Sequence, residues 1–173
     1  MKKPLRIIVL LHEDCVPPES RRELKELGEE KAKEFFRSLK INEARILGGN
    51  KQVAQAAAAG RIAFGLTDTD DAMVEIERAS SVMIVYPDRE SGQLGTLFIP
   101  NTLAIIKGCP HPDQARKLVD YLLSSSTEEK LAASPSAQIP LNPDAKALPR
   151  VETPRTVKAM EVDFMAAAKA WDA

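Results

Sequence analysis

Five consecutive polar residues are the clearest set of side chains that could do chemistry in this sequence. They follow an apolar run at residues 61–66 and are, in order, Thr67, Asp68, Thr69, Asp70 and Asp71. Their oxygens suit polar solutes and hard cations, so we expect all five to bind a ligand, with Asp70 and Asp71 as metal ligands. The same residue types also cap helices. A ligand site and a capped helix start are therefore equal alternatives.

Two known acidic motifs can be tested against this run by their spacing. An EF-hand loop requires a glycine after its alternating acids, so Ala72, with no glycine following, excludes it. Haloacid-dehalogenase-type phosphatases carry Asp-x-Asp-x-Thr or Asp-x-Asp-x-Val after a strand, and the run resembles this signature except at Ala72. Asp68 would be the nucleophile and Asp70 the acid/base of a magnesium-dependent phosphatase. That enzyme is the alternative function.

Two other positions could contribute to a binding site. Tyr86 stands at the end of a predicted strand, where it either lines a cleft or covers the core. The Gly48-Gly49-Asn50 turn precedes a predicted helix and could hold an anion on its backbone N–H groups. An ordinary tight turn with Asn50 as the helix cap is the simpler interpretation.

The elements that would position these residues alternate between strands and helices. Short β-branched runs predict strands, and apolar residues at helical spacing predict helices. This alternation favours an α/β fold with a mixed or mostly parallel sheet, in which polar residues after strands gather at one edge. The expected strands are 5–11, 44–47, 61–66, 81–86, 94–99 and 102–106, and the expected helices begin near 20, 29, 51, 70, 112, 126 and 157.

Composition excludes several classes of partner. The 173 residues are 44% hydrophobic with a net charge of −1, which gives no basic patch for nucleic acid or an anionic membrane. No segment is long and apolar enough to span a bilayer. The apolar run at residues 7–11 is too short for a signal peptide, so the chain as written is expected to be cytoplasmic.

From Gly28 onward the chain resembles periplasmic ferric-iron-binding proteins and other family 1 extracellular solute-binding proteins of ABC importers. The resemblance covers the second half of that family, about residues 28–173 here. It depends on the order and spacing of several segments, none of which is unique by itself. These segments are 27–36, 46–54, 60–72, 99–108 and 111–124.

This resemblance implies a type II periplasmic-binding-protein fold, a three-layer α/β sandwich that is incomplete here relative to the full two-lobe form. Residues 28–98 would form the ligand-facing lobe, and residues 99–173 the crossover and the end of the first lobe. The chain would be a periplasmic binding protein and not an enzyme, with a small solute as ligand and an importer permease as partner. A tyrosine pair binds ferric iron in iron-binding members and falls on Asp70 and Asp71, so iron or another hard cation stays one possible ligand and no cofactor is certain.

The first residues depart from this family. Residues 1–20 resemble instead the opening strand of D-alanine–D-alanine ligases. We therefore expect residues 1–27 to be a foreign or remodelled strand and helix that fills a vacancy in the sheet, and the chain to be a truncated or fused form.

Overall fold

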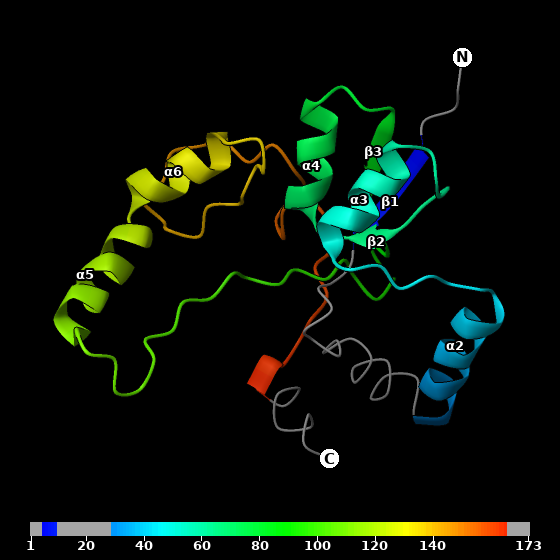
Figure 1. Cartoon of the computed structure of the whole chain (residues 1–173), viewed down its shortest axis with the longest axis horizontal. Helices are drawn as coiled ribbons and strands as arrows, with labels where there is room; N and C mark the ends of the chain where they lie inside the picture. Colours follow the sequence, from blue (N-terminus) through cyan, green and yellow to red (C-terminus); the bar gives the residue numbers. More distant parts are fainter. Residues whose placement is uncertain (1–4, 10–28, 166–173) are drawn as a thin grey trace.

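The computed structural model describes residues 5–9 and 29–165, and its centre is a parallel sheet (Figure 1). Three strands form this sheet in the order β2-β1-β3. Ile8 pairs with Leu66 on one side and with Val85 on the other, both in parallel register. The predicted parallel α/β arrangement is thus observed. The strands are β1 (Leu5–Val9), β2 (Leu66–Thr67) and β3 (Val82–Val85).

The strand of the N-terminal segment that we expected to be foreign or remodelled occupies the centre of the sheet. β1 comes from the first 27 residues and contributes the backbone to which both β2 and β3 are hydrogen-bonded. Parallel strands cannot be joined by a tight turn, so each must be followed by a crossover. The N-terminal segment is therefore part of the structural centre of the molecule.

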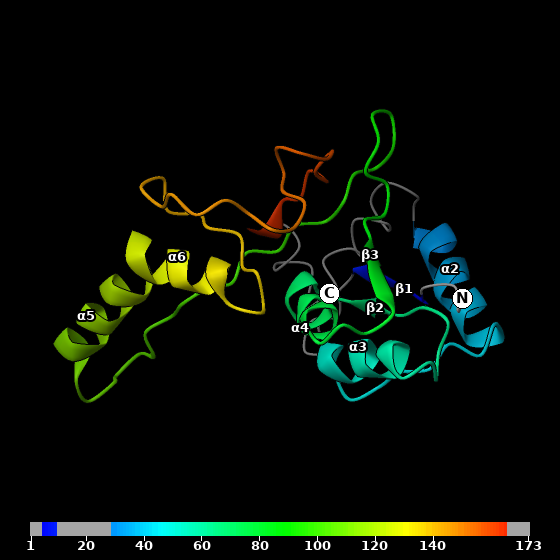
Figure 2. The same cartoon turned by 90° about the horizontal axis from the view of Figure 1, so that it is seen from above.

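Two helices cover one face of this sheet. α3 (Asn50–Ala58) packs on β1 and β2, and α4 (Thr69–Glu77) packs on β1 and β3. Figure 2 shows both helices on the same side of the strands. Among the described helices, α3 and α4 make the main contacts with the sheet, and the third layer of the expected sandwich stays a prediction.

Small residues allow the two helices to approach closely. Ala54, Ala57 and Ala72 form the buried cluster between α3 and α4, and the strand side chains Val82 and Ile84 pack against it. A methyl group at Gly65 would lie 2.3 Å from the Val53 side chain, so this position tolerates only glycine without a shift. The alanine-rich sequence of α3 is explained by this close packing.

A second region lies at the other end of the molecule, away from the sheet in both views (Figures 1 and 2). It contains α5 (Pro112–Leu122) and α6 (Ser125–Ala133), and none of the residues of α5 is buried. α2 (Glu29–Ile41) confirms the helix predicted from residue 29. Among the helices of the described ranges, none is long and apolar enough to cross a membrane.

Residues 134–153, called the strap from here on, connect the two regions. Backbone N–H groups of Leu141, Asn142 and Lys146 donate to Glu128 and Glu129 of α6 at 2.5, 2.7 and 2.7 Å. At its far end the strap reaches α4, because Arg150 forms an ion pair with Glu77 at 2.6 Å. The strap carries no helix or strand, in keeping with its four prolines, Pro135, Pro140, Pro143 and Pro149.

Several predicted strands are wrong or shorter than expected. Residues 44–47 form no strand: Ile46 is 91% exposed, and none of the strands in the described ranges pairs with this stretch. The strand predicted at 61–66 is reduced to Leu66–Thr67, since the close approach at Gly65 ends its regular course. Residues 94–99 and 102–106 form no strand, apart from one parallel bridge between Thr96 and Ala159.

The helix boundaries also differ in detail. α3 is capped by Gly49 and begins at Asn50, so Asn50 is not its cap. α6 begins at Ser125, close to the expected start near residue 126, and is capped by Ser124, whose hydroxyl accepts a hydrogen bond from the Thr127 N–H group. Residues 157–163 are not helical, because this stretch is hydrogen-bonded to residues 89 and 96 instead. The helix expected near residue 20 lies outside the described residues.

Candidate functional site

The five polar residues lie where the chain leaves the central sheet. β2 ends at Thr67 and α4 begins at Thr69, so Asp68 forms the junction between a parallel strand and its helix. β3 ends at Val85, directly before Tyr86. In open parallel sheets this carboxyl edge is where ligands bind. The fold therefore places both predicted site segments at the expected edge, on either side of β1.

Thr67 lies behind this edge and holds it together. Its residue is completely buried, and its hydroxyl donates a 2.9 Å hydrogen bond to the carbonyl oxygen of Asn50. A buried hydroxyl with a satisfied bond orients the chain and leaves little for a solute. The bond fixes the first residue of α3 against the end of β2.

Asp68 is the point at which the two helices meet. It caps α4 by accepting a 3.2 Å hydrogen bond from the Asp71 N–H group. Its other oxygen accepts a 2.5 Å hydrogen bond from the side-chain amide of Asn50, which is 5% exposed. One carboxyl group thus ties the first turn of α3 to the first turn of α4, and Asp68 serves as the cap of α4.

The environment of Asp68 favours its neutral form. Burial, a hydrogen bond with the Asp70 side chain and the negative charge of Asp70 raise the pKa of Asp68 from 3.8 to about 7. The bonds from Asn50 and from the Asp71 N–H group oppose this shift. Near neutral pH Asp68 is therefore partly protonated, and a cationic group bound beside it would favour loss of that proton.

Asp70 and Asp71 complete a compact acidic cluster. One oxygen from each of Asp68, Asp70 and Asp71 can be chosen so that all lie within 4.8 Å of one another. All three residues are half-buried. Thr69, also half-buried, begins α4 beside them. Close oxygen ligands of this type suit a hard cation or an ammonium group.

Two further side chains that the sequence did not single out, Gln138 of the strap and Asn101, extend the cluster. The amide nitrogen of Gln138 donates a 3.0 Å hydrogen bond to Asp70, and Asn101 donates at 3.0 Å to the amide oxygen of Gln138. Gln138 is 68 positions away from Asp70 in the chain. No local pattern signals such a contact, so only the fold reveals it. The acidic cluster with Asn50, Gln138 and Asn101 is called the polar edge below.

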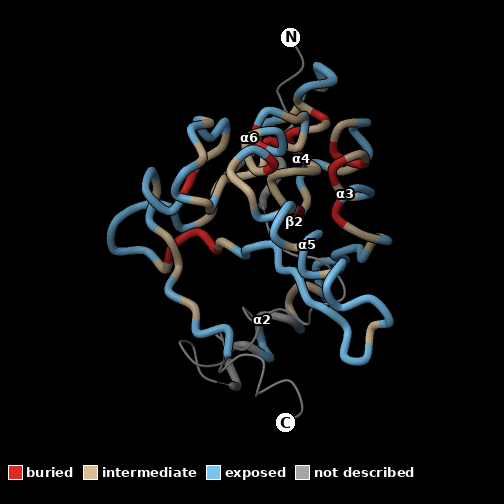
Figure 3. The backbone as a smooth tube through the Cα atoms, turned by 90° about the vertical axis from the view of Figure 1, so that its left-hand side faces the viewer, coloured by how far each residue is buried: buried red, intermediate tan, exposed pale blue. Residues whose placement is uncertain are grey.

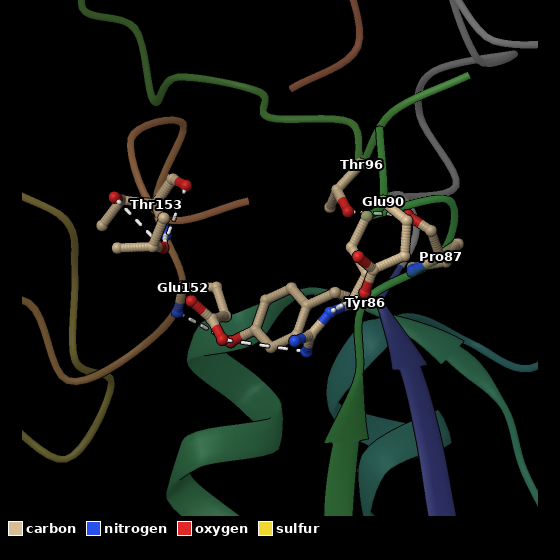
Figure 4. Close-up of polar contacts among 8 residues, drawn as sticks. Tyr86, Pro87, Glu90, Thr96, Glu152 and Thr153 are labelled. Atoms are coloured by element: carbon tan, nitrogen blue, oxygen red, sulfur yellow. Dashed lines mark hydrogen bonds and ion pairs between the residues drawn. The ribbon is translucent and has the colours of Figure 1, made fainter. Parts of the chain in front are cut away.

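Tyr86 is used differently from the acids. Its hydroxyl accepts a 3.1 Å hydrogen bond from the N–H group of Glu152 in the strap, above the end of β3 (Figure 4). Burial raises the pKa of Tyr86. The Glu152 carboxylate lies 3.8 Å from Arg89. Tyr86 therefore fastens the strap to the sheet, and its hydroxyl is not directed at the acidic cluster by this bond.

The loop after Tyr86 is fixed by Thr96, and the neighbouring Gly95 lies against the segment that follows the strap. Thr96 is 2% exposed, and its hydroxyl donates a 2.6 Å hydrogen bond to the carbonyl oxygen of Pro87. A methyl group at Gly95 would lie 2.6 Å from the backbone of Ala159, and the φ of Gly95 is +107°. Only glycine allows these two chain segments to approach each other.

The geometry argues against the phosphatase alternative. The carboxyl group assigned as nucleophile, that of Asp68, is occupied by the helix cap and by Asn50. A carboxyl group with a pKa of about 7 is also a poor nucleophile at neutral pH, because much of it is protonated. The cluster can orient and bind a cationic group, and it lacks the arrangement that covalent phosphoryl transfer requires.

Comparison with known families gives a match over most of the chain. The profile of bacterial extracellular solute-binding proteins matches residues 10–159. The matched range contains every residue of the polar edge. Proteins of this family are non-enzymatic components of transport systems, in agreement with the prediction of a binding protein and not an enzyme.

Curated relatives match a shorter part of the chain. A candidate 2-aminoethylphosphonate-binding periplasmic protein of Salmonella typhimurium is 26% identical over 73 residues, and those of Salmonella paratyphi A and Salmonella typhi match to the same extent. The match covers 42% of this chain and 22% of each relative. No solved structure shows a significant match.

Proposed function

Because the chain belongs to the bacterial extracellular solute-binding proteins, we propose that it binds a small polar solute at the polar edge for delivery to an ABC importer permease. The observation that carries the proposal is the convergence of Asn50, Asp68, Asp70 and Gln138 at the carboxyl end of the sheet. These groups come from α3, α4 and the strap. A solute there would touch both the sheet region and the strap.

The chemistry of the polar edge favours a solute with a positively charged group. One oxygen from each of three carboxyl groups can be chosen so that all lie within 4.8 Å of one another, and a cationic group there would favour the charged form of Asp68. Asp70 and Asp71 are the proposed direct ligands, with Thr69 beside them. Thr67 and Asp68 position these groups, and Tyr86 acts through the strap.

An anionic group on the same solute has a complementary place nearby. α3 has Gly49 as its cap and no side-chain cap bond, so its first N–H groups are available to an anion. Asn50 in that turn lies 2.5 Å from Asp68. A zwitterion such as 2-aminoethylphosphonate, named for the Salmonella relatives, would place its ammonium group on Asp70 and its phosphonate at α3.

Calorimetric titration with three probes tests this proposal. We expect 2-aminoethylphosphonate to bind more tightly than ethylamine or ethylphosphonate, each of which lacks one charged group. Asp70→Asn should weaken the binding of 2-aminoethylphosphonate and of ethylamine by about tenfold, because one charge-assisted hydrogen bond of about 1.5 kcal/mol is lost. The same substitution should leave the affinity for ethylphosphonate unchanged. Equal binding of all three probes, or of none, would exclude the proposal.

A hard cation such as ferric iron is the second candidate ligand, because the acidic cluster has the oxygen ligands that such ions prefer. Asp70 and Asp71 would be its ligands. Binding would expel the proton of Asp68, so a titration with ferric citrate, Ca²⁺ or Mg²⁺ near pH 7 should release protons that Asp68→Asn no longer releases. Binding without proton release would argue against a site that includes Asp68.

The division of the chain forms part of the same proposal. Residues 28–98 would be the ligand-facing lobe, residues 99–173 the crossover and the end of the other lobe, and residues 1–27 the segment that supplies the central strand. The expected site of action is the periplasm, as the family is extracellular or periplasmic.

A further inference from the structure

Both oxygens of the Asp70 carboxylate have partners in the structure. Oδ1 accepts a 3.1 Å hydrogen bond from the N–H group of Asp71, which lies in the first turn of α4. Oδ2 accepts a 3.0 Å hydrogen bond from the side-chain amide of Gln138. The first donor is the backbone of a helix, and the second is the end of a long side chain from the strap. Gln138 is thus the partner that can leave Asp70 without disturbing α4.

The chain around Gln138 directs its amide nitrogen to Asp70. Asn101 donates a 3.0 Å hydrogen bond to the amide oxygen of Gln138, so the nitrogen of that amide faces Asp70. Ala137, one of the two buried residues of the strap (Figure 3), has a φ of +52° and donates its N–H group to the Ser134 carbonyl at 3.0 Å. Alanine keeps this left-handed conformation only where its surroundings hold it there. The turn before Gln138 is therefore fixed.

The strap does not depend on Gln138 to stay in place. After Gln138, the N–H groups of Leu141 and Asn142 donate to the Glu128 carboxylate of α6 at 2.5 and 2.7 Å. The far end of the strap is held by the 2.6 Å ion pair between Arg150 and Glu77 of α4. The hydrogen bond between Gln138 and Asp70 can therefore open while the strap remains attached to both α6 and α4.

We infer that in the free protein the Gln138 amide occupies the position on Asp70 that the solute's ammonium group takes on binding, an inference that rests on the proposed function. An amide N–H and an ammonium N–H are both donors, and Oδ2 of Asp70 is an acceptor for either. The ammonium group adds the attraction of opposite charges, which the neutral amide lacks. An ammonium group can therefore displace Gln138, whereas a neutral donor gains little over the bond already present. Gln138 lowers the affinity for every solute that uses Asp70 and restricts this position to charged donors.

Titration of the wild type and of Gln138→Ala with ethylamine, 2-aminoethylphosphonate and ethylphosphonate tests this inference. Loss of the competing amide should tighten the binding of the two amines about fivefold, which corresponds to one ordinary hydrogen bond. Ethylphosphonate has no ammonium group and should bind both proteins equally. Asn142→Ala is the matched control, because it removes a 2.8 Å amide bond from the same strap to the Leu123 carbonyl. It should leave all three affinities unchanged.

The results distinguish a failure of this inference from a failure of the proposed function. Equal or weaker binding of the amines by Gln138→Ala than by the wild type would overturn the inference alone, because the ammonium group would then bind beside Gln138 or to it. Tightening in Asn142→Ala to the same extent would also overturn it, because a looser strap would be the cause. Binding of neither amine by either protein would overturn the proposed function, and the inference with it.

Exchange of the Gln138 side-chain amide protons with water tests the wild type directly. Their magnetic resonance signals are identified by their absence from Gln138→Ala. Ethylamine should speed this exchange, because the amide loses Asp70 as its acceptor, and ethylphosphonate should not. Slower exchange with ethylamine would mean that the solute bonds to Gln138, and unchanged exchange would mean that Gln138 stays on Asp70. Either result would overturn the inference.

Discussion

The sheet region and the α5–α6 region use different interactions to stay folded. In the first, α3 and α4 press fully buried alanines against each other and against strand side chains. In the second, α5 buries none of its residues and α6 is fastened to the strap by hydrogen bonds from backbone groups to Glu128 and Glu129. Packing therefore supports the first region, and hydrogen bonds to a connecting segment support the second.

This difference explains why the polar edge lies where it does. Its acids belong to the closely packed region, where Asp68 and Asn50 hold the first turns of α3 and α4 together. Its outer groups, Gln138 and Asn101, belong to segments outside that core. A solute at this edge would bond to a rigid set of acids on one side and to a more weakly held strap on the other.

The largest difference in unfolding free energy between the two regions should come from an Ala→Leu substitution made once in each. Ala57→Leu adds volume at a position with 0% exposure, where no space is available, and should lower the free energy of unfolding by about 1–3 kcal/mol. Ala133→Leu, at an exposed position of α6, should change it by less than about 0.5 kcal/mol. Urea denaturation followed by circular dichroism measures both. Equal losses would show that the two regions are packed alike.

The helix caps of the two regions provide a second contrast. Asp68→Ala removes the cap of α4 and also leaves the buried Asn50 amide without its partner, so it should cost about 2–3 kcal/mol of unfolding free energy. Ser124→Ala removes the cap of α6 at a solvated site and should cost about 1 kcal/mol. Thermal denaturation of both variants compares them. A larger loss for Ser124→Ala would contradict the central role given to Asp68.

The pH dependence of stability should also arise in the sheet region. The pKa of Asp68 is about 7 when folded and ordinarily 3.8, so the folded state holds a proton that the unfolded chain releases. The stability that Asp68 contributes is therefore complete below pH 3.8 and is lost as the pH rises toward 7. Asp68→Asn keeps a cap oxygen but has no proton to lose. The urea concentration at the unfolding midpoint should fall less with rising pH in Asp68→Asn than in the wild type. Parallel plots of this midpoint against pH would contradict the raised pKa of Asp68.

The smallest effect is expected at the junction of the two regions. Gln138→Ala removes one hydrogen bond to Asp70 from a half-buried side chain and should lower the free energy of unfolding by at most about 1 kcal/mol. Its clearer result should be faster amide exchange in the strap with little change in α3. Faster exchange in α3 as well would mean that the strap helps to hold the sheet region together.

Local patterns were sufficient for much of the fold. The helical spacing near residue 29 predicted α2, and the acids after an apolar run predicted the junction at Asp68 and its cap. Both signals lie within a few residues of the structure they describe. The relation to solute-binding proteins was likewise predicted from segments whose order the chain preserves, and the family is confirmed at that general level.

The predictions that failed depended on distant partners. Residues 44–47 and 102–106 have the composition of strands, but a strand forms only where another backbone lies beside it, and none of the described residues pairs with them. Gln138 reaches Asp70 across 68 positions, which no short motif encodes. Tyr86 also has a distant partner that its local sequence does not encode, because its hydroxyl accepts a hydrogen bond from the Glu152 N–H group of the strap.

The location of solute binding can be measured directly by following backbone amide signals in a nuclear magnetic resonance titration with 2-aminoethylphosphonate. Binding at the polar edge should shift the signals of Asn50, residues 68–71 and Gln138, and leave those of α5 in place. Asp70→Asn should reduce these shifts at equal solute concentration. Shifts confined to α5 and α6, or an unchanged spectrum at saturating solute, would contradict the account that the sheet edge binds the solute.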